Sequence, residues 1–193
     1  MILIGTSFLA CRKNGASEPQ SPEDVQREQV PPTKPDDGAS PTKTIYVMRH
    51  AEKEAILGEH DPPLTDVGIA RSEALRDRLE QTKVDAIYSS EYRRTMQTAL
   101  PTAEANQQTI TTYNPAADPR EFAELLRSSP AESILVIGHS NTIPPLLYAF
   151  GSEIEAIGES QYGDLYVLTI RGDKVTLQVE EIALESTHES PSP

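Results

Sequence analysis

Two histidines each follow an apolar run and could perform chemistry together. Arg49 and His50 come directly after the run 44–48, and His139 follows the run 134–137 through a single glycine. Aliphatic and β-branched runs of this length predict strands, and open α/β sheets build their sites beyond the carboxyl ends of strands. We therefore expect the two imidazoles to meet over one pocket, where a neutral imidazole could act as a nucleophile.

The two histidines could instead bind a metal ion. Metal sites with histidine ligands usually include a nearby carboxylate or a third histidine. An arginine beside a cation is unfavourable, and Arg49 is the immediate neighbour of His50. The sequence therefore predicts neither a metal nor another cofactor at this pocket.

Strands and helices are predicted to alternate along most of the chain. A helix should begin at Thr65, which is a suitable N-cap, with Ile69, Leu75 and Leu79 on its buried face. Phe122, Leu125 and Leu126 should share one face of a later helix. The predicted strands cover 44–48, 84–88, 109–113, 133–137, 165–170 and 175–180, and the later helices cover 91–103 (after a Ser89-Ser90 cap), 119–127 and 141–150. This order predicts a three-layer α/β/α sandwich with a mostly parallel central sheet.

The chain contains three motifs in this order: Arg49-His50-Ala51-Glu52, the stretch 89–99 (Ser-Ser-Glu-Tyr-Arg-Arg-Thr-Met-Gln-Thr-Ala) and Gly138-His139-Ser140. Together they resemble the histidine phosphatase superfamily, the phosphoglycerate mutase-like group, and its small single-domain phosphatases in particular. The resemblance implies that His50 attacks phosphorus and becomes a phosphohistidine. It also implies that Arg49 and Arg94 hold the phosphate and that His139 donates a hydrogen bond to the transferring group. Ser140 and Asn141 are candidate substrate-binding residues by their position.

The proton donor for the leaving group is not fixed by the resemblance. Members of the family carry this acid on a loop after the arginine helix or directly after the second histidine, where this chain has Ser140. Glu52, Asp61 and His60 in the first loop are the candidates. Glu52 could instead orient a catalytic side chain, which is the interpretation we favour, and Asp61 could brace the loop. We therefore expect activated leaving groups to be turned over better than alkyl phosphates.

These observations predict a metal-independent phosphohydrolase that works through a covalent phosphohistidine. Its substrate would be a phosphorylated small molecule or a phosphoprotein. Three alternatives remain open: a noncatalytic phosphate- or phospholigand-binding module on the same fold, a phosphomutase, and a protein that serves mainly for interactions in the cell envelope. The region after the Arg94 helix is short for the lid that a mutase needs to exclude water.

Composition limits the possible partners. The chain has 193 residues, of which 37% are hydrophobic, and this suits one domain with an extension. A net charge of −13 disfavours nucleic acid and anionic lipid. The single cysteine excludes an intrachain disulfide, and no apolar run has the length of a membrane span. The sequence leaves the oligomeric state open.

The N-terminal region predicts export to a bacterial cell envelope. Residues 1–11 resemble a lipoprotein signal whose Cys11 would be lipidated, although no basic residue precedes the apolar run. An upstream start codon would supply such residues. Residues 12–43 are rich in Pro, Ser, Gln and acidic residues and predict a disordered tether. The domain would then cover 44–183 and a flexible tail 184–193. A membrane contact would come only through the lipid, and the alternative is a cytoplasmic protein with a disordered N-terminal tail.

Overall fold

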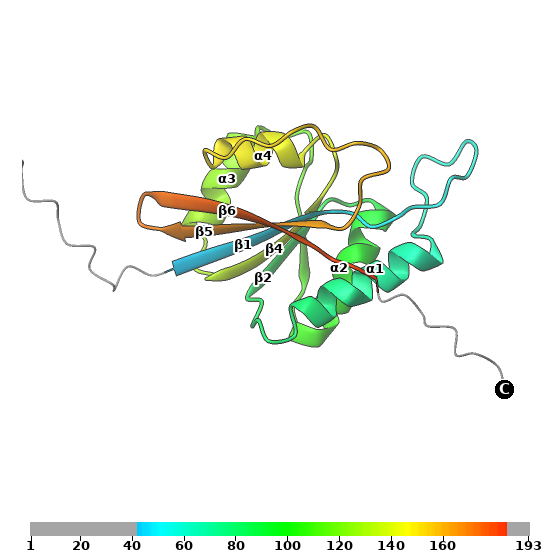
Figure 1. The fold of residues 1–193 in the computed structure, drawn as a ribbon, viewed down its shortest axis with the longest axis horizontal. Helices are drawn as coiled ribbons and strands as arrows, with labels where there is room; N and C mark the ends of the chain where they lie inside the picture. Colours follow the sequence, from blue (N-terminus) through cyan, green and yellow to red (C-terminus); the bar gives the residue numbers. More distant parts are fainter. Residues whose placement is uncertain (1–41, 185–193) are drawn as a thin grey trace, which may run out of the picture. The chain divides into compact units, whose positions relative to one another are not determined.

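The computed structural model describes residues 42–184, drawn in colour in Figure 1. The predicted signal segment with Cys11, most of the tether and residues 185–193 lie outside the described part. The elements in chain order are β1 (Thr42–Arg49), α1 (Asp66–Arg78), β2 (Ala86–Ser89), α2 (Arg93–Asn106), β3 (Ile110–Thr112), α3 (Pro119–Ser128), β4 (Ser133–Gly138), α4 (Ile143–Ala149), β5 (Asp164–Arg171) and β6 (Lys174–Glu181).

The strands form a single sheet in the order β3-β2-β4-β1-β5-β6. The four strands from β3 to β1 are parallel, and β5 and β6 add an antiparallel hairpin at one side. β4 lies between β2 and β1 and is buried from Ile134 to Gly138, as four consecutive aliphatic residues predict. The predicted, mostly parallel sheet is confirmed.

Helices cover both faces of this sheet, as Figure 1 shows. Successive residues of β1 point to opposite faces of the sheet, so they contribute to two separate parts of the hydrophobic core. Met48 packs with Leu75 of α1 and Ala99 of α2 on one face. Val47 packs on the other face with Leu126 of α3 and with α4. The predicted three-layer sandwich is therefore confirmed.

The buried stripe of α1 differs from the predicted one. Ile69 is 45% exposed, whereas Gly68, Ser72, Leu75 and Leu79 are buried. These four positions recur at helical spacing, and Ile69 lies one residue, about 100°, away from them. The backbone of Gly68 lies directly against the backbone of Glu52. A Cβ at position 68 would collide with the Glu52 carbonyl oxygen, so this approach requires a glycine. A close approach of backbone to backbone, rather than an apolar contact, therefore sets the rotation of this helix.

The predicted face of α3 is also partly wrong. Leu125 is 47% exposed, and the buried positions are Ala123 and Leu126, with Phe122 packed at their edge. The end of α3 is held by Lys43, whose Nζ donates to the carbonyl oxygens of Leu126 and Arg127 at 2.9 Å. Because β1 begins at Thr42, this lysine belongs to the strand and not to the predicted tether.

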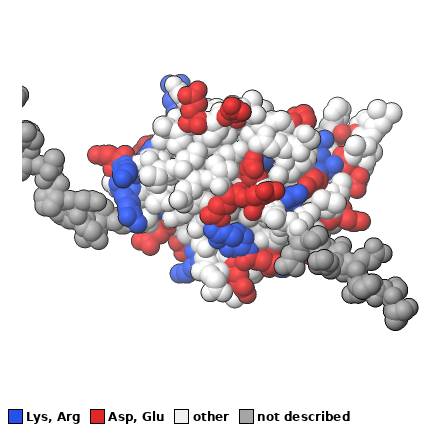
Figure 2. Space-filling model, viewed as in Figure 1, with Lys and Arg blue, Asp and Glu red and all other residues white. Residues whose placement is uncertain are grey.

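The surface carries acidic and basic side chains in mixed order on the face shown in Figure 2. Between residues 42 and 184, none of the helices combines the length and the apolar character that crossing a membrane requires.

Candidate active site

The two histidines of the motifs meet at the carboxyl ends of β1 and β4. These strands are parallel neighbours, with Arg49 opposite Gly138, and the N–H of His50 donates to the Gly138 carbonyl at 2.9 Å. The ring centroids of His50 and His139 are 5.4 Å apart, with the planes at 66°. Both side chains are buried. The structure therefore brings together the pair of imidazoles that the sequence places at two strand ends.

One ring nitrogen of His50 is held by the backbone. Its Nδ1 lies 2.8 Å from the carbonyl oxygen of Ala51, and because a carbonyl only accepts, Nδ1 carries the proton. Burial, together with the charges of His139, Arg49 and Arg94, lowers the pKa of His50 to about 3. The ring is therefore neutral near pH 7, and Nε2 keeps its lone pair. This is the protonation state that a nucleophilic histidine requires.

Arg49 is fixed by the loop between α4 and β5. Its Nη1 donates to the carbonyl oxygens of Gly158, Glu159 and Gln161 at 2.7–3.0 Å. Its guanidinium stacks on the ring of Tyr162, 4.2 Å from the centroid. Nη1 is thus fully occupied, while the buried Nε has no partner within the described residues. Arg49 can therefore offer Nε to an anion, together with Nη2, whose contacts to Tyr162 and Glu159 are long at 3.4 and 3.5 Å.

Arg94 approaches from the first turn of α2. Its guanidinium lies 4.3 Å from the centroid of the Tyr92 ring, and Nη1 is 3.5 Å from Oδ1 of Asp61. The buried Nε of Arg94 is also without a partner in the part of the chain that the structure describes. Arg93, the neighbouring arginine of the same motif, is exposed. Two buried guanidinium N–H groups without acceptors indicate a place for an oxyanion.

These side chains line one open cavity of about 420 Å³. Its lining includes six of the predicted residues, Arg49, His50, Arg94, His139, Ser140 and Asn141, and also Lys53, Tyr92, Pro115, Ala116, Thr142 and Glu159. An adjoining cavity of about 600 Å³ shares Tyr92, Pro115 and Ala116 and is also lined by Asp61. The cavity of the two histidines thus adjoins further space for the rest of a substrate.

His139 is anchored on its buried side by hydroxyl groups. Its Nε2 lies 2.8 Å from Oγ of Ser90, whose Oγ is in turn 2.9 Å from Oγ1 of Thr95. Burial and the charges of Arg94 and Arg49 lower the pKa of His139 to about 4, against a smaller opposing effect of Asp61. The ring is therefore neutral at physiological pH. The sequence suggests Ser90 as a helix cap, which is wrong, because the N-cap of α2 is Tyr92.

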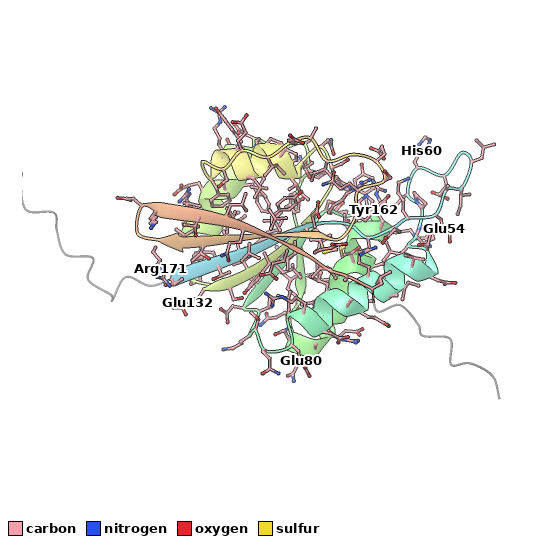
Figure 3. All side chains as sticks on the ribbon, in the orientation of Figure 1. Glu54, His60, Glu80, Glu132, Tyr162 and Arg171 are labelled. Atoms are coloured by element: carbon pink, nitrogen blue, oxygen red, sulfur yellow. The ribbon has the colours of Figure 1, made fainter. Side chains whose placement is uncertain are left out.

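Two of the three candidate proton donors, Glu52 and Asp61, are engaged by neighbouring arginines, and His60 is exposed. Glu52 receives hydrogen bonds from Nε and Nη2 of Arg71 at 2.6–2.9 Å. Burial tends to raise the pKa of Glu52, but the hydrogen bonds and charge of Arg71 outweigh it and hold the pKa below its usual value. Asp61 accepts from the N–H of Arg93 at 2.8 Å and braces Arg94. Figure 3 shows His60 on the projecting first loop, where it is exposed, and Tyr162 closer to the sheet.

Several site residues were not predicted. One set belongs to the loop that accepts hydrogen bonds from Arg49, with Glu159 and Tyr162. This loop has no hydrophobic period or motif from which its role could be predicted. Lys53 could have been noticed because it lies three residues after His50, and a third cation suits an anion site. Within residues 42–184, no group of three or more His, Cys, Asp and Glu side chains is placed to hold a metal ion.

Comparison with known proteins supports the family that the motifs indicate. Residues 45–115 match the model of the histidine phosphatase superfamily (branch 1), and this match includes Arg49, His50 and Arg94. This match confirms the resemblance to the histidine phosphatase superfamily. The match supports a phosphatase, as the resemblance of its motifs implies. No curated protein matches the chain.

Solved structures of small histidine phosphatases share the fold. A protein named as phosphohistidine phosphatase SixA from Nakamurella multipartitia superposes with a TM-score of 0.56 at 23% identity, covering 72% of this chain and 96% of that one. Its counterpart from Agrobacterium tumefaciens gives 0.54 at 24%, covering 69% and 97%. The protein histidine phosphatase SixA complexed with tungstate gives 0.61 at 17%, covering 72% and 97%. At these identities the likeness concerns the fold.

Proposed function

We propose that this phosphatase works through a covalent phosphohistidine at His50 and needs no metal ion. The observation that carries the proposal is the state of the His50 ring: Nδ1–H is bound to the Ala51 carbonyl, and the free Nε2 belongs to a side chain that lines the cavity of Arg49 and Arg94. In the first step Nε2 attacks phosphorus, and the bond to the leaving group breaks with its electron pair. In the second, water displaces His50 and inorganic phosphate forms.

The two arginines would take the role that a metal ion has in other phosphatases. The phosphoryl group carries negative charge on its equatorial oxygens during transfer, and catalysis consists mainly of positioning and charge stabilisation. The Nε groups of Arg49 and Arg94 are buried and, among the described residues, have no acceptors. A bound phosphoryl oxygen would satisfy them. This donor set supports an anion more than it supports a cation.

We propose activated phosphoryl compounds as substrates, with phosphohistidine on a protein as the first candidate. None of Glu52, Asp61 and His60 is free and close to His50, and a leaving group that departs without a proton removes the need for an acid. The names of the SixA neighbours support the same class. Hydrolysis is favoured over mutase activity because Glu159, at the mouth of the cavity, has a side chain that is 86% exposed, which leaves the site open to water.

The test is hydrolysis of p-nitrophenyl phosphate with EDTA present. His50→Ala should lower kcat/KM by at least about 10³-fold, whereas His60→Ala, on the exposed loop, should keep wild-type activity. Phosphate release from a phosphohistidine peptide should follow the same pattern. Activity that survives His50→Ala contradicts the assigned nucleophile, and activity lost to EDTA contradicts metal independence. Phosphate binding without turnover of any substrate would instead identify a noncatalytic module.

We also propose that the protein is exported and held in a bacterial envelope through a lipid on Cys11. Support comes from the sequence 1–41 alone, with its apolar segment, cysteine and polar Pro-rich stretch. Palmitate labelling and membrane fractionation should both be lost in Cys11→Ser. Equal fractionation of wild type and variant would contradict the anchor.

A further inference from the structure

A chain of buried hydroxyl groups ends on the second histidine of the site. It runs from Nε2 of His139 to Oγ of Ser90 and on to Oγ1 of Thr95, with distances of 2.8 and 2.9 Å. Both hydroxyl residues are fully buried. Because Nε2 is occupied on this side, Nδ1 is the one ring nitrogen that remains for a group in the cavity. If Nδ1 carries the ring proton, His139 donates a hydrogen bond to a group bound in the cavity. If Nε2 carries it, His139 accepts one.

The direction of the hydrogen bonds follows from Thr95. Its Oγ1 lies 2.8 Å from the Tyr92 carbonyl and 2.9 Å from the Ser90 carbonyl, and carbonyl oxygens only accept. If Thr95 donated to Ser90 Oγ instead, its Oγ1 would lie against both carbonyl oxygens at these distances with no hydrogen between them. Thr95 therefore donates to a carbonyl and presents a lone pair to Ser90. Ser90 donates to Thr95, and its own lone pair is left for Nε2–H of His139.

We propose that the Ser90–Thr95 pair holds His139 as the Nε2–H tautomer, so that Nδ1 accepts a proton from the water that hydrolyses the phosphohistidine. The family resemblance implies a His139 that donates to the transferring group, and in this tautomer its Nδ1 accepts instead. This inference rests on the proposed function, since it concerns the second step of that reaction. Ser90 and Thr95 are positioning residues that act through His139. The two histidines of the site then have opposite tautomers: His50 offers Nε2 to phosphorus, and His139 offers Nδ1 to water.

The step is balanced as follows. The oxygen of water attacks phosphorus, and the bond between phosphorus and Nε2 of His50 breaks, returning its electron pair to Nε2. One proton of the water moves to Nδ1 of His139, which becomes an imidazolium, and the other stays on the new phosphate. The imidazolium then gives its proton to the departing phosphate or to solvent.

The surroundings of His139 explain how a poor base can serve. Arg49, Arg94 and the neutral ring of His50 face it, and Tyr92 packs edge to face with a centroid distance of 5.1 Å. In the free site the arginines disfavour an imidazolium. In the phosphoenzyme a phosphoryl group with two negative charges lies among them, and Asp61 adds a further negative charge. A proton on His139 is then less costly, and the hydroxyl chain stabilises Nε2–H in both states.

The discriminating variant is Thr95→Val, which keeps the shape of the side chain and removes the hydroxyl. Ser90 then has no acceptor at Thr95, and its proton turns to Nε2 of His139, so that the ring proton moves to Nδ1. Thr102→Val is the matched control. Thr102 is a fully buried threonine on the same helix, two turns away, and its Oγ1 has no partner within residues 42–184. Thr95→Ser restores the hydroxyl and should rescue.

The first readout is the ¹⁵N spectrum of the histidine rings, assigned with His50→Gln and His139→Gln. Wild type should show His139 with an unprotonated Nδ1 and His50 with a protonated Nδ1. In Thr95→Val the His139 signals should change to protonated Nδ1, while Thr102→Val keeps the wild-type pattern. A protonated Nδ1 on His139 in wild type overturns the proposal. This readout needs no turnover, so it remains decisive even if His50 proves not to be the nucleophile.

The second readout is rapid-mixing kinetics with p-nitrophenyl phosphate. In Thr95→Val, phosphoenzyme hydrolysis should be slower by about 10–10²-fold, the size of a general-base effect. A burst of one equivalent of nitrophenolate should then precede a slow steady rate. Inhibition by inorganic phosphate should not weaken in Thr95→Val, because Nδ1–H of the variant can donate a hydrogen bond to an oxyanion. Equal rates in Thr95→Val and Thr102→Val overturn the proposal. Absence of any phosphoenzyme in wild type refutes the proposed covalent function instead.

Discussion

The imidazole of His139 lies edge to face against that of His50, with centroids 5.4 Å apart, and both rings are held neutral. This contact exists because β1 and β4 are parallel neighbours that end at the same level, Arg49 opposite Gly138. Two uncharged rings can share a buried site with two arginines, whereas two imidazolium ions there would repel each other and the guanidinium groups. The stability of the fold is therefore linked to the charge of the two rings.

Lowering the pH should unfold the protein through these histidines. Their pKa values are about 3 and about 4, against 6.5 for an unperturbed histidine. Below pH 6.5 the unfolded chain binds protons that the folded chain does not, so stability is lost as the pH falls from 6.5 toward 4. Each ring should contribute about 1.4 kcal/mol per pH unit. The free energy of unfolding can be measured with urea between pH 7 and 5. Its slope against pH should be smaller in His50→Gln than in wild type by this amount. Parallel curves for wild type and His50→Gln would disprove the linkage.

Glu52→Gln should lower stability rather than catalysis. The carboxylate is paired with Arg71, and the two side chains are 20% and 13% exposed. Loss of this pair should cost about 1–3 kcal/mol at pH 7. Because the folded-state pKa lies below 4.5, the difference from wild type is present above pH 4.5 and should shrink as the pH falls below it. The exposed Glu54→Gln is the control in urea unfolding. A kcat reduced more than about 10-fold would instead indicate that Glu52 acts as the acid.

Asp61→Asn should weaken the binding of phosphate esters to the same extent whatever their leaving group. Oδ1 of Asp61 forms an ion pair with Nη1 of Arg94 at 3.5 Å and accepts a hydrogen bond from the N–H of Arg93. Without the charge Arg94 is less well placed, so KM should rise about 3–10-fold, a loss of about 1 kcal/mol. The measurement compares an aryl with an alkyl phosphate, of which wild type should prefer the aryl ester. A much larger loss on the alkyl ester would identify Asp61 as the general acid.

Glu159→Gln should tighten the binding of inorganic phosphate. The Glu159 carboxylate is 3.5 Å from Nη2 of Arg49 and lines the cavity, so it competes with an incoming anion for this donor. Because its side chain is 86% exposed, the ion pair is weak, and Ki for phosphate should fall by about 2–5-fold. Glu155→Gln, exposed on the same loop, should leave Ki unchanged. A weaker affinity in Glu159→Gln would show that the carboxylate supports Arg49 instead.

The positions of the main elements follow from the sequence because they depend on local signals. Apolar runs predict β1 and β4, and Thr65 accepts a hydrogen bond from the N–H of Gly68 as an N-cap should. The predicted burial of Ile69 and Leu125 is wrong for a physical reason. A helix face is chosen by its neighbours, and for α1 the deciding neighbour is the backbone of Glu52 against Gly68. Such a contact leaves no trace in the hydrophobic period.

The sequence by itself determined the chemical groups of the site, because Arg49, His50 and His139 stand at the ends of strands that their own residues specify. Only the tertiary structure decided what those groups can do. The tautomer of His50 depends on the Ala51 carbonyl, the free donors of Arg49 depend on the loop at 158–161, and the state of His139 depends on hydroxyls from another strand end and helix. These contacts join segments up to about a hundred residues apart, and side-chain protonation is set by the groups that packing brings within hydrogen-bond distance.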